Sequence, residues 1–437
     1  MYKVVAIVIA LLLPALQARA WSDHASLVWP LARSLPGLAE TVSAESLDAF
    51  IASEAVGLVA VLDQHEAWSI ANVEHYPATP AGLRLQPGSV ERTSFLQAIR
   101  VNPRLPFLLY RQQTVDDPEG VDWPLSWVDL SFLGVGSSHE SIGYRPLMEG
   151  ESVKAAHVVA SGSDEPDFGM DIGLYENNGT EHGLQYGFGS QPFGNPNLDY
   201  GSQAPFHMGF YHLDWLTRLA QPDLLRTLPL WRISLYGRLS DFAFASGHPY
   251  WGWRFLGWAL HYVGDLTQPY HATPLPGVGT LDALWLVAQG RTGEAIQLVS
   301  NRHGVLESYQ FQRVNTAIAE TAWQSPLLQA ISSAVGSELL TEQGVIDELT
   351  ATSVDAAAAL DGVLTDHVPA RFVADPSFEW TGSGFESDVV ALIQQDGGSQ
   401  AITALDATVV EQLTRFGEYA RRWIERGLRA SAEAAGD

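Results

Sequence analysis

The chain has 437 residues, of which 46% are hydrophobic and 17% charged, and this composition excludes a disordered protein. Its 50 acidic and 24 basic side chains give a net charge of −26, which argues against a basic groove for duplex nucleic acid. The absence of cysteine excludes disulfides, thiolate metal sites and cysteine nucleophiles, so His, Asp, Glu or backbone groups must hold any metal.

The first twenty residues have the pattern of a secretory signal peptide. A basic start is followed by a mostly apolar stretch over residues 4–16 and then by Ala18-Arg19-Ala20. Because this stretch is short for a membrane span and contains Pro14, we expect cleavage after residue 20 and a secreted or periplasmic protein. Cleavage leaves Trp21 as the new terminus, whose amine and carbonyl oxygen can chelate a metal, with His24 nearby as a third ligand.

Most of the mature chain is expected to be helical. Ala/Leu/Val-rich runs and apolar segments predict helices over residues 22–60, 207–265, 280–300, 312–365 and 403–430. Residues 76–150 are richer in Pro and Gly, and residues 161–206 are loop-like, although their aromatic side chains favour an ordered, functional loop. Strand signals are sparse. We therefore predict an all-α protein with one domain over residues 21–437.

One predicted helix combines ionisable residues with an interior position. The stretch from Trp251 to Asp265 is apolar nearly all round, as in a central helix, yet His261 and Asp265 lie four residues apart on one face. Pro269 then forces a turn, and His271 follows. Buried ionisable groups are costly unless a partner or a cation compensates them. The pattern indicates either a structural His–Asp hydrogen bond or a metal site.

Three weaker patterns accompany this helix. His303 and Glu307 repeat the spacing of four residues, which by itself is expected by chance. The acidic turn Gly162-Ser163-Asp164-Glu165-Pro166-Asp167-Phe168 lacks the spacing of an EF-hand, and Asp167 between a proline and an aromatic suits a fixed ligand. The segment His207-Met208-Gly209-Phe210-Tyr211-His212 places two histidines among aromatics, where core and ligand roles are equally plausible.

Taken together and in this order, the patterns resemble the zinc-dependent phospholipase C and S1/P1 nuclease superfamily. The most specific match is segment 260–272, with a glycine before the acid and a proline before the second histidine. The resemblance implies a phospholipase C/P1 nuclease-like fold of many helices, with three zinc ions in a cleft. It covers residues 21–24 and 162–307, whereas residues 60–160 have no counterpart and are expected to form an insertion.

The resemblance also implies individual ligands. The first zinc would take Trp21, His24 and Asp265; the second would take Asp167, a histidine of the 207–212 segment, His261 and Asp265; the third would take His271, His303 and Glu307. The histidine partner of Asp167 stays open among His207, His212 and His182, in that order of preference. Asp167 would also act as the catalytic residue, orienting or deprotonating a water between the metals.

Two enzyme classes share such a metal core. A phospholipase C would hydrolyse a phospholipid at a membrane surface, and an S1/P1-type nuclease would cleave single-stranded nucleic acid. The aromatic Phe168 after the loop Asp resembles the phospholipase branch, where its implied role is to border the headgroup pocket, and Glu165 would give that pocket an acidic mouth suited to choline. The lack of cysteine and the negative charge also favour a phospholipase acting on phosphatidylcholine. A third possibility is an exported protein that binds metal without catalysis. No obligate protein partner is indicated.

Overall fold

The computed structural model describes residues 23–118, 121–133, 142–196, 199–336 and 338–436. Helices make up 64% of it and strands 3%, which confirms the all-α class. The expected signal peptide (residues 1–20) and Trp21 lie outside the described residues. Among the helices that are described, none has both the length and the apolar character needed to cross a bilayer.

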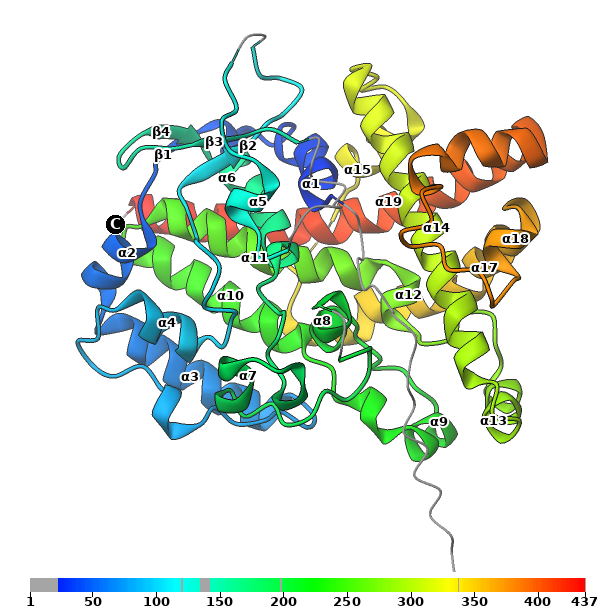
Figure 1. Ribbon diagram of the computed structural model, residues 1–437. Helices are drawn as coiled ribbons and strands as arrows, with labels where there is room; N and C mark the ends of the chain where they lie inside the picture. The colour runs from blue at the N-terminus through cyan, green and yellow to red at the C-terminus, as the bar shows by residue number, and fades with distance from the viewer. Residues whose placement is uncertain (1–22, 119–120, 134–141, 197–198, 337, 437) are drawn as a thin grey trace, which may run out of the picture.

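Helices follow one another along most of the chain (Figure 1), and buried side chains from Ala25 to Ile424 contribute to the larger hydrophobic core. In chain order, the α-helices are α1 (His24–Ala32), α2 (Leu47–Glu54), α3 (Gly57–Asn72), α4 (Arg92–Ala98), α5 (Trp127–Leu130), α6 (Ala155–Asp164), α7 (Glu181–Gln185), α8 (Asp199–His207), α9 (Trp215–Ala220), α10 (Pro229–Ala245), α11 (Pro249–Thr267), α12 (Pro269–Ala272), α13 (Thr280–Ala288), α14 (Thr292–Ala319), α15 (Pro326–Ser332), α16 (Glu342–Gly344), α17 (Ala351–His367), α18 (Ala370–Val373) and α19 (Val389–Gly436). The strands form two antiparallel pairs, β1 (Thr41–Ser43) with β4 (Ser152–Lys154) and β2 (Tyr110–Gln112) with β3 (Tyr144–Pro146).

Helix α11 is the central element of the fold. It packs against α6, α10 and α19 (Figure 1), and every residue over 250–267 is buried, which accounts for a sequence that is apolar nearly all round. The helix ends before Gln268, whose side chain accepts a hydrogen bond from the backbone N–H of Tyr270 and starts α12, with Pro269 as its first residue. This tight connection places His271 in the interior, one short helix beyond the end of α11.

Two glycines allow α6 and α11 to approach closely. A Cβ atom at Gly257 would lie 2.7 Å from the carbonyl oxygen of Val159, and one at Gly162 would lie 2.9 Å from the carbonyl oxygen of Arg254. Side chains at either position would push the two backbones apart. The close approach holds the 3₁₀ turn η4 (Glu165–Phe168), which follows α6 directly, against the central helix.

The segment expected to be one long loop is partly helical. Residues 161–206 include the end of α6, the turn η4, the short helix α7 and most of α8. Thr180 caps α7 by accepting a hydrogen bond from the N–H of Gly183 at 3.0 Å. Gly, Asn and Pro dominate this segment, so its composition predicted a loop. The short helices were missed because caps and packing stabilise them, rather than intrinsic propensity.

Candidate metal centre

Buried histidines and acids gather into three groups in the interior. In each group, one ligand atom per residue lies within 4.8 Å of the others, and every member is buried. The groups are His24 with His261 and Asp265, Asp167 with His207 and His261, and His271 with His303 and Glu307. His261 belongs to the first and second groups, so these two are adjacent. The described part of the chain thus holds three arrangements that can bind a metal ion.

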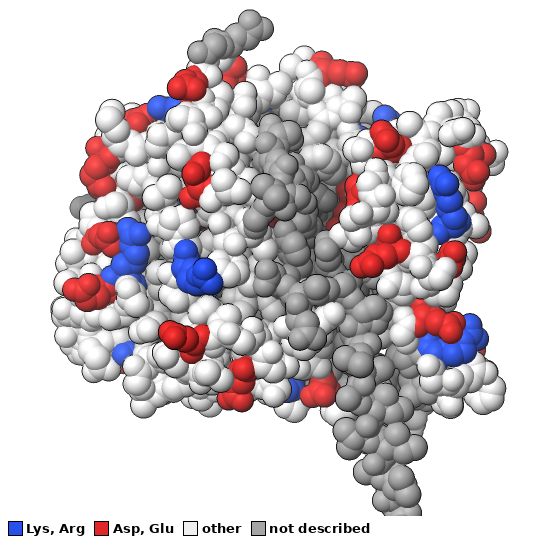
Figure 2. All heavy atoms as spheres, viewed as in Figure 1, with Lys and Arg blue, Asp and Glu red and all other residues white. Residues whose placement is uncertain are grey.

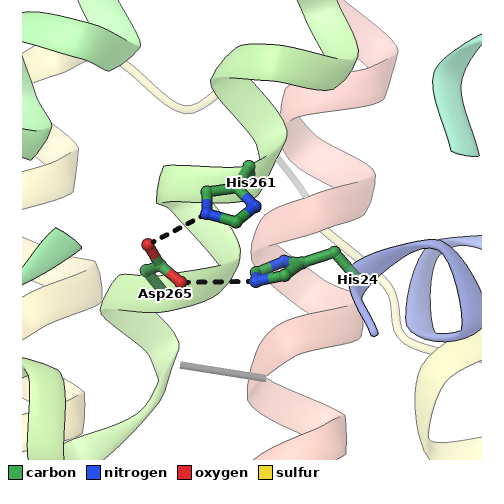
Figure 3. A group of neighbouring side chains, drawn as sticks. All are labelled: His24, His261 and Asp265. Atoms are coloured by element: carbon green, nitrogen blue, oxygen red, sulfur yellow. Dashed lines mark ion pairs between the residues drawn. The ribbon is translucent and has the colours of Figure 1, made fainter. Parts of the chain in front are cut away.

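The first group joins the start of α1 to the C-terminal part of α11 (Figure 3). The Asp265 carboxylate lies between two imidazoles, with Oδ1 3.3 Å from Nε2 of His24 and Oδ2 3.5 Å from Nε2 of His261. Asp23 caps α1 and fixes His24 as its first residue. A Cβ atom at Gly264 would lie only 3.1 Å from Nδ1 of His24, so the glycine leaves room for this ring.

The second group brings the last residue of α8 to the same carboxylate. Nδ1 of His207 lies 2.8 Å from Oδ2 of Asp265 and 3.2 Å from Nε2 of His261. Oδ1 of Asp167, from the turn η4, lies 3.7 Å from the same His261 nitrogen. Asp265 therefore faces three histidines from three different helices, a geometry that suits a carboxylate shared between two cations.

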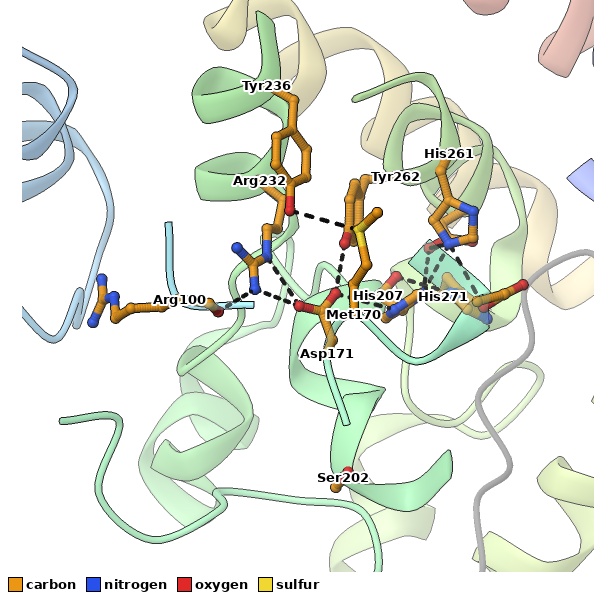
Figure 4. Close-up of polar contacts among 12 residues, drawn as sticks. Arg100, Met170, Asp171, Ser202, His207, Arg232, Tyr236, His261, Tyr262 and His271 are labelled. Atoms are coloured by element: carbon orange, nitrogen blue, oxygen red, sulfur yellow. Dashed lines mark hydrogen bonds and ion pairs between the residues drawn. The ribbon is translucent and has the colours of Figure 1, made fainter. Parts of the chain in front are cut away.

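A buried network orients His207 from behind (Figure 4). Its Nε2 lies 3.4 Å from Oδ2 of Asp171, and that oxygen also accepts a hydrogen bond from the Tyr262 hydroxyl at 2.5 Å. The other oxygen, Oδ1, accepts hydrogen bonds from Nε and Nη2 of Arg232 at 3.0 and 2.5 Å, while the guanidinium also donates to the carbonyls of residues 99 and 100. The network turns Nδ1 of His207 toward Asp265. Carboxylates behind histidine ligands play this orienting role in metal sites.

The third group contains a histidine prepared to act as a ligand. Nδ1 of His271 donates a hydrogen bond to the carbonyl oxygen of His207 at 2.8 Å, which leaves Nε2 buried and without a hydrogen-bond partner. Burial lowers the pKa of His271 to about 3, so the ring is neutral and Nε2 carries a lone pair. Nε2 of His303 lies 2.8 Å from Oε1 of Glu307 in the same group. An orphaned, neutral imidazole nitrogen beside a carboxylate is the arrangement that a divalent cation completes.

The electrostatics around the Asp265 carboxylate also favour a bound cation. Burial acts to raise the pKa of Asp265, but its interactions with the surrounding histidines, including hydrogen bonds from His207 and His24, hold it well below its ordinary value. Burial lowers the pKa of His207, yet Asp265 and Asp171 together raise it to about 10. Burial and the charge of His24 place the pKa of His261 well below its ordinary value. The site thus holds an ionised acid that protons on its histidines neutralise, and a cation can take their place.

The donor set fits zinc. The three groups offer five imidazoles and three carboxylates and no sulfur ligand. Nδ1 of His261 donates to the carbonyl oxygen of Ser163 at 2.8 Å, so Nε2 is the nitrogen left for the metal. Zinc accepts such nitrogen and oxygen donors, and the hydrogen bonds behind them fix the tautomer that it requires.

The structure places one of the three candidate histidines beside Asp167. His207 lies in its group, whereas His212 is exposed, with Nε2 2.8 Å from the carbonyl oxygen of Ile346. His182 lies in α7 and belongs to none of the three groups. The expectation that His212 is a metal ligand is corrected accordingly, because the chain turns to the surface after α8 and carries this residue away.

Glu165 and Phe168 occupy the packed interior, contrary to the expectation that they border a headgroup pocket. Glu165 is buried and pairs with Arg254, whose Nη2 lies 2.8 Å from Oε1, and it also accepts a hydrogen bond from the Trp258 indole. Phe168 is buried and meets Trp127 edge to face, with ring centroids 5.0 Å apart. Both side chains stabilise the turn that carries the neighbouring metal-group acid.

A cavity of about 430 Å³ lies between α1, β2, α6 and α14. Its lining combines aromatic rings with side-chain amides, including Trp29, His157, Phe311, Gln112, Gln113 and Asn315. Glu307, Phe311 and Asn315 follow one another at intervals of four along α14, so one face of this helix leads from the third group into the cavity. The cavity therefore lies beside the helix face that carries Glu307.

Acidic side chains are spread widely over the face shown in Figure 2, and Lys and Arg occur there in small separate groups. This distribution agrees with the net charge of −26. Comparisons with known protein families, curated proteins and solved structures found no match. The assignment of function therefore depends on the chemistry of the site.

Proposed function

We propose that the chain is an exported, zinc-dependent phosphodiester hydrolase, and specifically a phospholipase C that releases the phosphorylated headgroup of phosphatidylcholine. The observation that supports the proposal is the Asp265 carboxylate, which faces His24, His207 and His261 next to the group of Asp167. Adjacent cations that share a carboxylate are typical of enzymes that act on phosphate esters. The third group then completes a site for about three zinc ions.

The residues of the chain have distinct roles in this proposal. When bound, zinc would polarise a phosphoryl oxygen and lower the pKa of a bound water molecule toward neutral. Asp167 lies at the edge of the second group and orients the attacking water, whose proton it accepts. The water oxygen bonds to phosphorus, the bond from phosphorus to the glycerol oxygen breaks, and that oxygen takes up a proton from solvent to leave as the hydroxyl of diacylglycerol. Asp171 and Arg232 keep His207 in the tautomer and orientation that the site requires.

A second candidate is an S1/P1-type nuclease on the same metal core. The cavity beside the third group favours it, because amides such as Gln112 and Asn315 can hydrogen-bond a nucleobase and aromatic rings such as Trp29 can stack on one. The amides and aromatic rings of this lining suit a neutral base as well as they suit a lipid headgroup. The two candidates differ in substrate and share every metal ligand.

A paired assay tests the proposal. The protein beginning at Trp21 is incubated with phosphatidylcholine vesicles in one arm and single-stranded DNA in the other, each with and without a chelator. We expect chelator-sensitive release of phosphocholine. Release of nucleotides instead would move the protein to the nuclease class, and bound zinc with no hydrolysis in either arm would favour the non-catalytic alternative.

The variant Asp167→Asn tests the role of the proposed catalytic residue. We expect at least about a hundredfold loss of turnover, because a positioned base contributes that much or more. Asp223→Asn is the control, since Asp223 is an exposed acid outside the three groups. Turnover of Asp167→Asn close to that of the unmodified protein would remove Asp167 from the mechanism.

A further inference from the structure

Helices α9 and α13 each present a tryptophan and a leucine to solvent. On α9, Trp215 is 70% exposed and Leu219 is 74% exposed. On α13, Leu281 is 74% exposed and Trp285 is 64% exposed. In both helices the two residues are four apart and share a face. We call these four side chains the apolar ridge, and large exposed apolar side chains gathered in this way mark an interaction surface.

A side-chain hydrogen bond joins the two helices at their starts. Asp214 caps α9 by accepting hydrogen bonds from the backbone N–H groups of Leu216 and Thr217. Its Oδ2 also accepts a hydrogen bond from the hydroxyl of Thr280, the first residue of α13, at 2.9 Å. Figure 1 shows α9 and α13 at the same lower corner of the molecule. The two apolar pairs thus lie on neighbouring helices at this corner.

The apolar ridge is connected to the metal centre by short stretches of chain. Helix α9 begins shortly after His207, and α13 begins shortly after His271. These stretches are held together, because the N–H of Gly209 donates to the carbonyl oxygen of His271 at 2.8 Å. Helix α13 also contacts α14, which carries the other two residues of the third group. Docking through the apolar ridge would therefore hold the metal centre close to the surface to which the protein binds.

The charges beside the apolar ridge indicate which surface it fits. Arg218 on α9 bonds Glu74 at 2.9 Å, and Arg291 after α13 bonds Glu294 at 2.8 Å. Both cations are thereby neutralised, and the chain as a whole has a net charge of −26, which repels anionic membranes. Tryptophan prefers the level of lipid headgroups, and leucine enters the acyl boundary. The composition suits a zwitterionic bilayer.

We propose that the apolar ridge docks the protein onto a zwitterionic phospholipid bilayer, from which the metal centre draws its substrate. The proposal deepens the phospholipase C function and rests on it for the identity of the substrate. Docking itself is a property of the four exposed side chains, so it can be measured without turnover.

Vesicle flotation in the presence of a chelator measures docking by the full mature protein. The probes are vesicles of phosphatidylcholine alone and vesicles that also contain phosphatidylglycerol. We expect binding to phosphatidylcholine, about tenfold weaker binding by the double variant Trp215→Ser/Trp285→Ser, and no increase with the anionic lipid. The control is Val56→Ser/Met148→Ser, which removes two apolar side chains that are equally exposed elsewhere. Because all four positions are exposed, these variants should fold normally.

Flotation results that would overturn the proposal are equally specific. They are a lack of binding by the unmodified protein, equal binding by the ridge variant, or binding that rises with phosphatidylglycerol. A second pair, Leu219→Ser/Leu281→Ser, should weaken binding in the same way and excludes an effect confined to tryptophan.

Hydrolysis separates failure of docking from failure of the proposed function. The ridge variant should lose turnover of vesicles and keep turnover of monomeric dihexanoyl-phosphatidylcholine. A protein that binds vesicles through the ridge yet hydrolyses neither lipid would support docking and reject the phospholipase C function. A protein that hydrolyses the monomeric lipid but does not bind vesicles would reject docking alone.

Discussion

Replacing Asp171 with asparagine tests whether the network behind His207 positions a metal ligand. Arg232 is fully buried, and the change removes the negative charge that faces its Nε and Nη2 at 3.0 and 2.5 Å. Breaking a buried ion pair on one side costs about 3–5 kcal/mol of unfolding free energy, because a charge is left unpaired. The same change removes the carboxylate that lies 3.4 Å from Nε2 of His207. Loss of such a carboxylate typically weakens metal binding about 10- to 100-fold.

The control for Asp171→Asn is a second Asp–Arg pair with the same chemistry. Asp117→Asn leaves Arg111 unpaired in a largely buried site, where Nη1 lies 2.9 Å from Oδ2, and Asp117 belongs to none of the three metal groups. Unfolding free energy is measured with denaturant, and zinc affinity by competition with a chromophoric chelator. We expect both variants to lose similar stability and only Asp171→Asn to lose zinc affinity. An equal fall in affinity for both variants would refute a positioning role for Asp171.

Three further predictions concern other parts of the molecule. Gly264→Ala should weaken zinc binding about tenfold by crowding His24. The unfolding free energy should change little, because the higher helix propensity of alanine, about 1 kcal/mol, offsets the cost of the crowding. Unchanged zinc titrations would count against the crowding. Burial and the charges of three nearby arginines lower the pKa of His65 to about 3 from an ordinary value of 6.5, so the folded state resists protonation and stability falls as pH drops below 6.5. Between pH 6.5 and 4, denaturant unfolding should show about 3 kcal/mol more loss for the unmodified protein than for His65→Phe, and parallel curves would contradict this. A residue added before Trp21 should cost about one zinc ion per chain, and full zinc content in the extended protein would exclude the terminal amine as a ligand.

The parts of the site that share one helix were predictable from the sequence. His261 and Asp265 lie four apart on an apolar helix, so their relative position follows from helix geometry, and Pro269 marks the turn that leads to His271. His24 lies far away in sequence, and only the resemblance to a known family linked it to this helix. The structure brings it within 3.3 Å of Asp265 because Gly264 leaves room for its ring.

Contacts between distant segments could not be read in this way. Nothing in the spacing of Asp171 and Arg232 indicates that they pair, since 61 positions separate them. The acidic turn showed how many acids it contains but not which direction each one faces. Glu165 turns toward Arg254 on α11 and becomes part of the interior, whereas Asp167 turns toward His261. Tertiary packing determines the direction of each side chain, and this packing cannot be inferred from the composition of the turn.

The zinc content of purified mature protein tests the central claim most directly. Elemental analysis should give about three zinc ions per chain beginning at Trp21. The variant His271→Ala should lose about one of them, because Nε2 of His271 is a buried nitrogen of the third group without a hydrogen-bond partner. A single bound metal, or a zinc content that His271→Ala leaves unchanged, would contradict a trinuclear centre built from these residues.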